Sequence, residues 1–291
     1  MPDSEPGFPP LVLTFAASDP SGGAGMQADL LTLASMGCHP LSVITALTVQ
    51  DSLGVEGMMP IDSDWVADQA RCLLEDMPVD AFKIGVMGSV ENIAAIAEIV
   101  SDYPDVPLIL DPVLASGRGD ELASDEMMRA MRELLLPQTT LLTPNSHELR
   151  RLAESDDDEE RTLEQCAARL IETGCEFVLV TGTHENTPQV VNTLYGSKGV
   201  VRSDSWQRLP ASYHGSGCTL ASAIAAMLAN GLDLPEAVRE AQEYTWQTLR
   251  RAYRPGMGQF LPDRLFWARE ESEARSDEQE VPRAADVRGS H

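Results

Sequence analysis

Residues 11–36 read LVLTFAASDPSGGAGMQADLLTLASM, and this stretch contains the repeating unit from which the fold is predicted. An uninterrupted apolar run, 11–17, is followed by a glycine-rich turn and then by a helix-like pattern over 25–36. A continuous apolar run, as opposed to an alternating one, is typical of a strand that is covered on both faces. Strand, turn and helix in this order predict a β–α unit whose helix packs on a parallel sheet.

The same alternation continues along the chain. Further apolar runs lie at 41–49, 81–87, 107–113, 140–143 and 177–181, and the helix-like stretches between and beside them are 64–75, 90–100, 124–135 and 162–173. Two late runs, 190–195 and 199–202, are split by a Gly-Ser-Lys turn and predict a β-hairpin. We therefore expect an α/β protein of three αβα layers, with a doubly wound, mostly parallel sheet.

The domain organisation follows from the same pattern. No linker interrupts the alternation, so we predict a single domain over 11–268. A flexible N-terminus is expected over 1–10, and the charged, apolar-poor stretch 269–291 predicts a disordered acidic tail. The acidic run SDDDEE at 155–160 predicts a solvated loop or the lead-in to a helix, and not a metal site.

Composition excludes several classes of partner and location. The chain has 46 acidic against 21 basic residues, a formal net charge of −25, so neither nucleic acid nor an anionic membrane is an expected partner. No apolar run approaches the roughly 20 residues that span a bilayer, and residues 1–10 do not resemble a signal peptide, so a cytoplasmic protein is expected. Five scattered cysteines indicate neither a disulfide framework nor a zinc site.

The heptapeptide HGSGCTL, residues 214–220, precedes an apolar helix predicted over 219–230. Two glycines frame Ser216, so several backbone N–H groups are exposed at a helix N-terminus, where the dipole favours an anion. Cys218 in this position is expected to have a lowered pKa and some thiolate character. The alternative interpretation is a glycine turn that carries a buried, inert cysteine.

Polar residues also follow other predicted strands, and in open parallel sheets ligands bind beyond these strand ends. Thr48 and Gln50 follow the second strand, and Asp111 follows the fourth. Asn145 and Glu148, three residues apart, share a helical face and suit a hydrated Mg²⁺ with a phosphate substrate. The alternative is an N-cap residue with its capping-box partner. Together, metal ligands, backbone donors and a base indicate phosphoryl transfer.

Several long motifs resemble one known family. The chain resembles the hydroxymethylpyrimidine/phosphomethylpyrimidine kinases of thiamine biosynthesis, within the ribokinase-like superfamily, over roughly residues 11–265. The motifs that carry the resemblance are SDPSGGAGMQAD (18–29), SVITALTVQD (42–51), KIGVMGS (83–89), LDPV (110–113), LLTPNSHE (141–148) and HGSGCTLASAIA (214–225).

The resemblance implies a role for each matching position. Gln50 is expected to bond the aminopyrimidine. The other residues expected at the pyrimidine pocket are Asp29, Ala17, Ser18, Thr48 and Met87, although a methionine is often only core filler. The Mg²⁺–phosphate site is expected from Asp111, Asn145 and Glu148. The anion hole is expected from Gly215, Ser216, Gly217 and Cys218, with Cys218 in the catalytic-base position.

The chain departs from the family in its nucleotide motif. The family usually has Lys-Gly-Gly-His after the sixth strand, where this chain has Thr181, Gly182, Thr183 and His184. Loss of a phosphate-binding lysine is expected to weaken ATP binding unless another cation replaces it, and Arg118 in a flap-like stretch is the candidate.

The expected activity is ATP- and Mg²⁺-dependent phosphorylation of 4-amino-5-hydroxymethyl-2-methylpyrimidine and its monophosphate. Two alternatives stay open at this point: a pyridoxal-type kinase, and a non-catalytic pyrimidine-binding or regulatory protein. The family likeness also suggests a homodimer.

Overall fold

The computed structural model describes residues 8–153 and 161–269. The acidic run 155–160, the expected tail from residue 270 onward and the first seven residues of the expected flexible N-terminus lie outside the described residues. Residue 269, which was assigned to the tail, ends a short helical turn.

One mostly parallel sheet runs through the described residues, as predicted. Its order is β3-β2-β1-β4-β5-β6-β7-β8-β9. Neighbouring strands from β2 to β7 pair in parallel, while β3, β8 and β9 are antiparallel to their neighbours. The strands are β1 (Leu11–Ser18), β2 (His39–Gln50), β3 (Val55–Pro60), β4 (Ala81–Ile84), β5 (Leu108–Leu110), β6 (Leu141–Leu142), β7 (Phe177–Val180), β8 (Gln189–Gly196) and β9 (Gly199–Gln207).

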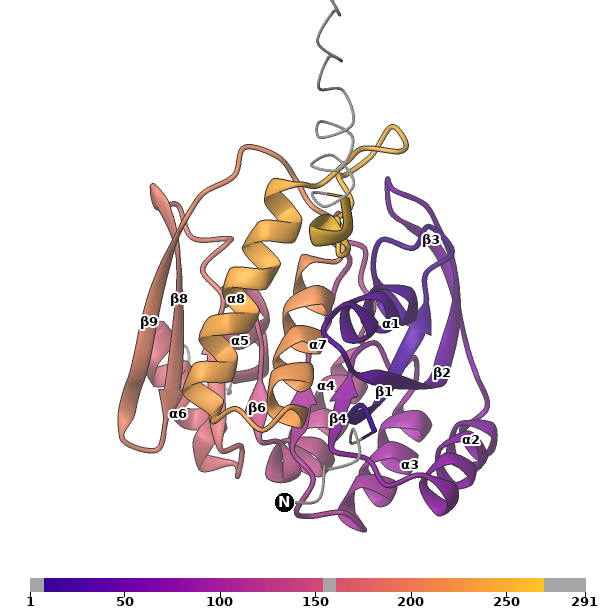
Figure 1. Ribbon diagram of the computed structural model, residues 1–291. Helices are drawn as coiled ribbons and strands as arrows, with labels where there is room; N and C mark the ends of the chain where they lie inside the picture. The colour runs from indigo at the N-terminus through magenta and orange to yellow at the C-terminus, as the bar shows by residue number, and fades with distance from the viewer. Residues whose placement is uncertain (1–7, 154–160, 270–291) are drawn as a thin grey trace, which may run out of the picture.

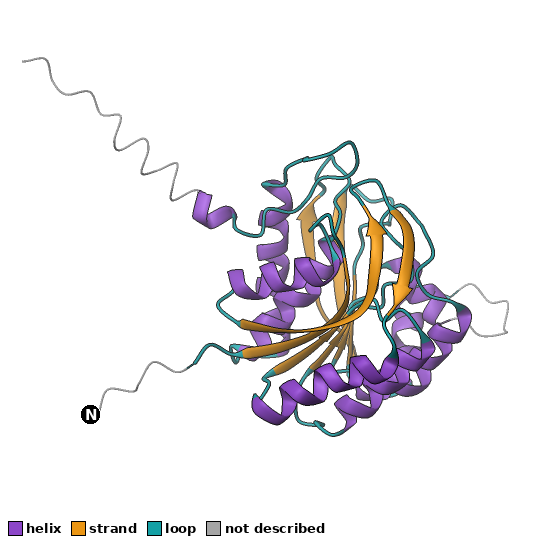
Figure 2. Ribbon diagram, turned by 90° about the vertical axis from the view of Figure 1, so that its right-hand side faces the viewer, coloured by secondary structure: helices purple, strands orange, loops and turns teal. Residues whose placement is uncertain are grey.

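Helices cover both faces of this sheet (Figures 1 and 2), so the three-layer prediction is confirmed. One layer is formed by α1, α7 and α8, in which α7 contacts both of the others, and the other layer is formed by α2 to α6. The helices are α1 (Gly25–Ser35), α2 (Ser63–Asp76), α3 (Val90–Ser101), α4 (Asp125–Ala130), α5 (Ser146–Ala153), α6 (Leu163–Glu172), α7 (Ser216–Ala229) and α8 (Leu234–Arg250).

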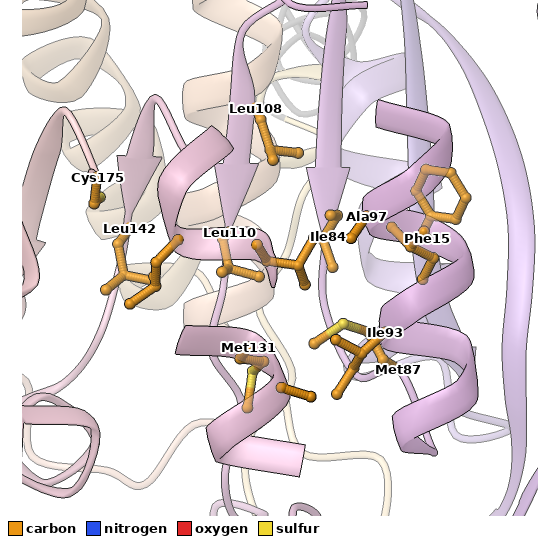
Figure 3. Close-up of a cluster of buried hydrophobic side chains, with 14 of the residues drawn as sticks. Phe15, Ile84, Met87, Ile93, Ala97, Leu108, Leu110, Met131, Leu142 and Cys175 are labelled. Atoms are coloured by element: carbon orange, nitrogen blue, oxygen red, sulfur yellow. The ribbon is translucent and has the colours of Figure 1, made fainter. Parts of the chain in front are cut away.

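The core is divided by the sheet into two clusters, which explains why the strands read as continuous apolar runs. Along β1, Leu13 and Phe15 face the cluster under α2 to α6, shown in part in Figure 3. Val12, which directly precedes Leu13, faces the cluster under α1, α7 and α8. Successive residues of one strand point to opposite faces of the sheet. They are all buried, because each face is covered by its own layer of helices.

Three local features differ from the sequence-based expectations. Strand β3 was not predicted, because its sequence, VEGMMP, contains a glycine and ends in proline, which sheets tolerate mainly at an edge. The helix predicted over 124–135 changes after Ala130 into a π-helical turn. Helix α7 begins at Ser216, three residues before its predicted start, because the chain turns at Gly215.

The strand order locates the functional edge of the sheet. From β1 the chain first adds β2 on one side and then crosses to add β4 on the other side of β1. Such a reversal of winding opens a crevice outside the carboxyl ends of the strands.

Within the described residues, no helix is both long and apolar enough to cross a membrane.

Candidate active site

A cavity of about 510 Å³ lies where the strands β1, β2, β5, β6 and β7 end and where α7 begins. The structure brings together on its wall most of the residues singled out from the sequence, whose roles stay predictions. These residues are Ala17, Ser18, Thr48, Gln50, Asp111, Asn145, Glu148, Thr181, Thr183, His184, Gly215, Ser216, Gly217 and Cys218.

The N-terminus of α7 depends on a glycine that no other residue could replace without strain. Gly215 precedes the helix with φ of +78°. A Cβ atom on Gly215 would lie 1.9 Å from the carbonyl oxygen of Gly23, which is far inside contact distance. The close approach brings the glycine-rich loop after β1 against the first turn of α7. Ser216, Gly217 and Cys218 of that turn line the cavity, and a helix N-terminus in this position favours an anion.

The thiol of Cys218 differs from the expectation of a lowered pKa. Its burial raises the pKa to about 12, and the carboxylates of Asp111 and Asp29 add to this effect. The positive charge of Lys83 acts in the opposite direction but is outweighed. A hydrogen bond links Cys218 to the Asp111 carboxyl. The sequence indicates that Cys218 lies near a helix N-terminus, but it does not show that Asp111 and Asp29 lie close to its thiol.

Asp111, which is buried, and Glu148, which is half-buried, form a pair of acids on the cavity wall. Burial raises the pKa of Asp111 to about 6, although Lys83 partly offsets it. Burial and the charge of Asp111 raise the pKa of Glu148 to about 8. Both shifts mean that the positive charge near the two carboxylates is too small to offset their burial.

The capping interpretation of Asn145 and Glu148 is also observed. Asn145 Oδ1 accepts hydrogen bonds from the N–H groups of His147 and Glu148, at 2.9 Å each. In return, Glu148 Oε2 accepts one from the N–H of Asn145 at 2.9 Å. This capping box fixes Glu148 beside Asp111, so the cap and a metal site are compatible.

The chemistry of this acid pair fits Mg²⁺. Asp111 Oδ2 is buried and has no hydrogen-bond partner among the described residues. Among the residues that the structure describes, no cluster of three His, Cys, Asp or Glu side chains could hold a metal by itself. Mg²⁺ in phosphoryl-transfer sites characteristically uses one or two carboxylates together with water and substrate phosphates. Two acids and an adjacent anion site meet that requirement.

Asp29 does not lie on the cavity wall, contrary to the expectation that it lines the pyrimidine pocket. Its side chain is closed to solvent. Lys83 Nζ lies 2.9 Å from both of its carboxylate oxygens, and the hydroxyls of Thr14 and Ser222 donate to it at 2.7 and 2.8 Å. The carboxylate therefore has its full set of partners inside the protein, beneath the site.

Two further candidates lie away from the wall. Met87 belongs to the hydrophobic core, where Figure 3 shows it beside Ile93, and the neighbouring Val86 reaches the cavity instead. Arg118 is exposed, and its side chain lies against Gly54 of the loop between β2 and β3. It is therefore not placed to replace the missing lysine in this structure.

Sequence reasoning missed three residues of the wall. Asp19 accepts hydrogen bonds from the N–H groups of Ser21 and Ala24, and thereby shapes the loop after β1. His214 contacts Asp19 and was passed over within the heptapeptide. Arg208 follows β9, and no sequence motif marked it.

Arg208 is the one arginine or lysine among the described residues that line the cavity. Its guanidinium donates hydrogen bonds to the carbonyl oxygens of Thr183, Glu185 and Thr187, at 2.8 to 3.1 Å. The guanidinium of Arg208 thus holds the loop that carries Thr183. Arg208 is distant from Thr181 in the sequence, so its contact with this loop could not be predicted from the sequence.

Comparison with known proteins identifies the family. The family model described as phosphomethylpyrimidine kinase matches residues 19–263. The chain belongs to this family. Among phosphomethylpyrimidine kinase relatives, the hydroxymethylpyrimidine/phosphomethylpyrimidine kinase of Streptomyces coelicolor is 38% identical over 257 residues, which cover 87% of this chain and 93% of the relative. The thiamine biosynthesis bifunctional protein ThiED of Geobacter sulfurreducens is 38% identical over 247 residues, covering 85% of this chain and 50% of that protein.

A solved structure confirms the ribokinase-like architecture. The pyridoxal kinase from Staphylococcus aureus in complex with ADP has a TM-score of 0.81 and 28% sequence identity, covering 90% of this chain and 96% of that one. The fold is thus shared with pyridoxal kinases, while the sequence is more similar to the phosphomethylpyrimidine kinase relatives.

Proposed function

We propose that the protein transfers the γ-phosphate of ATP to 4-amino-5-hydroxymethyl-2-methylpyrimidine and then to its monophosphate, within thiamine biosynthesis. One observation carries the proposal: a single cavity holds the Gln50 amide, the Gly215–Cys218 turn and the acids Asp111 and Glu148, in a chain of the phosphomethylpyrimidine kinase family. These are the groups needed to hold an aminopyrimidine alcohol in line with a triphosphate.

The phosphoryl-transfer part of the site works mainly by positioning and by charge stabilisation. Backbone N–H groups of the Gly215–Cys218 turn hold the negative charge that develops on the transferred group. Asp111 and Glu148 would hold Mg²⁺, which when bound would neutralise phosphate charge. The metal would also supply the two acids with the positive charge that their raised pKa values show to be insufficient.

Cys218 is proposed to accept the proton of the substrate hydroxyl. The raised pKa of its thiol means that the resting side chain is protonated and hydrogen-bonded to Asp111. Lys83 is the nearby cation that lowers this pKa, and neutralisation of Asp111 removes one of the charges that raise it. Mg²⁺ held at Asp111 would therefore favour the thiolate form of Cys218.

The nucleotide is proposed to contact Asn145, Thr181, Thr183 and His184. Arg208 supports this part of the site, because its guanidinium fixes the loop that carries Thr183 and its positive charge faces a cavity that must accept a polyphosphate. The pyrimidine is proposed to lie against Ala17, Ser18 and Thr48, with its amino group on Gln50.

The alternative with a specific observation in its favour is a pyridoxal-type kinase, because a pyridoxal kinase has the same architecture at a TM-score of 0.81. A competition assay separates the two. The protein is given equal amounts of the aminopyrimidine alcohol and pyridoxal, with ATP and Mg²⁺. The proposal expects predominantly pyrimidine phosphate, and predominant pyridoxal phosphate would replace it with the alternative.

A homodimer and a cytoplasmic location remain predictions. Leu47, Val49 and Met59 form an exposed apolar group on the edge strand β3 and its neighbour β2, a feature that is typical of a protein interface. A reaction that consumes ATP favours the cytoplasm.

A further inference from the structure

Three polar side chains meet at the pyrimidine end of the cavity. His214 Nε2 lies 2.7 Å from Asp19 Oδ2 and 3.0 Å from the Gln50 amide atom placed as Nε2. The other amide atom, placed as Oε1, lies 3.1 Å from Thr48 Oγ1. Asp19 and His214 are only 2% and 8% exposed, so the contact between them is shielded from bulk water.

The position of one hydrogen atom follows from these contacts. Burial opposes ionisation of Asp19, but hydrogen bonds from His214, Ser21 and Ala24 outweigh it and lower the pKa of the carboxyl below its usual value. Asp19 is therefore a carboxylate, and the imidazole nitrogen 2.7 Å away must carry hydrogen and donate it. A protonated Nε2 cannot also accept a hydrogen bond from an amide NH₂ group.

The amide of Gln50 satisfies every contact when its oxygen and nitrogen exchange places. With its oxygen toward His214, it accepts from the same Nε2–H that Asp19 accepts from. With its NH₂ group toward Thr48, it donates to Oγ1, whose own hydrogen is already given to the carbonyl oxygen of Ser18 at 2.8 Å. The two ends of an amide have nearly the same shape, so its neighbours decide the orientation.

We propose that His214, held by Asp19, is a positioning residue that fixes the Gln50 amide in this orientation and thereby selects an aminopyrimidine over an oxopyrimidine. The proposal deepens the proposed function and rests on it for the class of substrate. A fixed amide presents an oxygen acceptor beside an N–H donor. An aminopyrimidine edge offers the complementary amino donor beside a ring nitrogen acceptor, whereas an oxopyrimidine offers the reverse pattern.

The imidazole is rigidly held, as this role requires. A Cβ atom on Gly23 would lie 2.2 Å from the ring carbon Cδ2 of His214, so the ring packs directly on the glycine loop. The backbone N–H of His214 donates to the carbonyl oxygen of Phe260 at 2.9 Å. Gly215, the next residue, begins the anion-binding turn, so the residue that orients Gln50 is joined to the turn that holds phosphate.

Calorimetry on the full chain tests the proposal with three probes: the aminopyrimidine alcohol, its 4-oxo counterpart, and AMP-PCP with Mg²⁺. His214→Ala removes the donor, while His214→Gln returns an N–H donor at about the same distance. His39→Gln, at an exposed histidine, is the control. In His214→Ala we expect about tenfold weaker binding of the amino compound and a preference for amino over oxo close to one. AMP-PCP affinity stays within twofold, and His214→Gln regains part of the preference.

Two results would overturn the proposal: an unchanged amino-over-oxo preference in His214→Ala, or an equal loss of affinity for all three probes. If His214→Ala does not fold, nitrogen-15 NMR of histidine-labelled wild-type protein decides, with the His214 signal assigned by its loss in His214→Gln. A proton on Nε2 supports the proposal and a bare Nε2 contradicts it. Failure of the wild-type protein to phosphorylate the aminopyrimidine alcohol would instead contradict the proposed function, and the NMR result is independent of that outcome.

Discussion

Lys83 Nζ lies 2.9 Å from both carboxylate oxygens of Asp29, and both side chains are entirely closed to solvent. This pair joins β4 to α1, and Ser222 of α7 donates a further hydrogen bond to Asp29 at 2.8 Å. The elements β4, α1 and α7 are thus joined beneath the cavity. Lys83 also supplies the positive charge that opposes the high pKa values of Cys218 and Asp111.

Replacing one member of this pair should be strongly destabilising. Lys83→Met leaves the Asp29 carboxylate buried without its counter-charge, a change that typically costs about 3–5 kcal/mol. Denaturant unfolding of the variant measures the loss, and Lys198→Met, at an exposed turn between β8 and β9, is the control. Equal stability of the two variants would contradict the structural role of the pair.

The acid pair predicts a stability that depends on both pH and Mg²⁺. The pKa values of Asp111 and Glu148 are raised in the folded protein to about 6 and about 8. The folded state thus retains protons that the unfolded chain has released, so without metal the stability falls as pH rises from about 4 to about 8. We expect Mg²⁺ to raise the melting temperature at pH 8, on the order of 5 °C, and to have little effect at pH 5.

Thermal melts of wild-type protein and of Asp111→Asn, with and without Mg²⁺, measure this dependence. The variant should show a flatter pH profile and a smaller Mg²⁺ effect, whereas Asp105→Asn, at an exposed loop position, should behave as wild type. A Mg²⁺ effect that is independent of pH would count against the acid pair as the metal site.

Cys218 should matter for turnover far more than for folding. Removal of a general base typically costs 10²- to 10⁴-fold in rate, so Cys218→Ala should lose roughly that much kcat while its melting temperature changes by a few degrees at most. Steady-state kinetics with the aminopyrimidine alcohol measure the loss. Wild-type turnover in Cys218→Ala would remove the base assignment.

Arg208 should affect the nucleotide and not the pyrimidine. Arg208→Gln releases the loop that contains Thr183 and removes the positive charge from the cavity wall, so we expect the KM for ATP to rise about tenfold. The KM for the pyrimidine should stay within twofold. Arg129→Gln, at an exposed position of α4, controls for the general loss of one positive charge. Equal effects of the two substitutions would show that Arg208 acts only through net charge.

Local patterns were sufficient to predict the sheet, its helical layers and most of the cavity wall, because strands, turns and helices depend on neighbouring residues. Asp29 and Met87 were misplaced for a different reason. Other residues of their motifs line the cavity. The ion pair with Lys83, which is distant in sequence, holds Asp29 in the interior of the protein. Packing in the hydrophobic core holds Met87 there. The pKa of Cys218 depends on Asp111 and Asp29, which come from other elements, so position in a helix could not determine it.

The most direct test is to incubate the purified protein with the aminopyrimidine alcohol, ATP and Mg²⁺, and to count phosphates on the pyrimidine by mass spectrometry over time. The proposed function predicts a monophosphate that appears first and a diphosphate that follows it. A monophosphate alone would remove the second step, and absence of any phosphorylated pyrimidine, under conditions where the protein binds ATP, would contradict the proposed function.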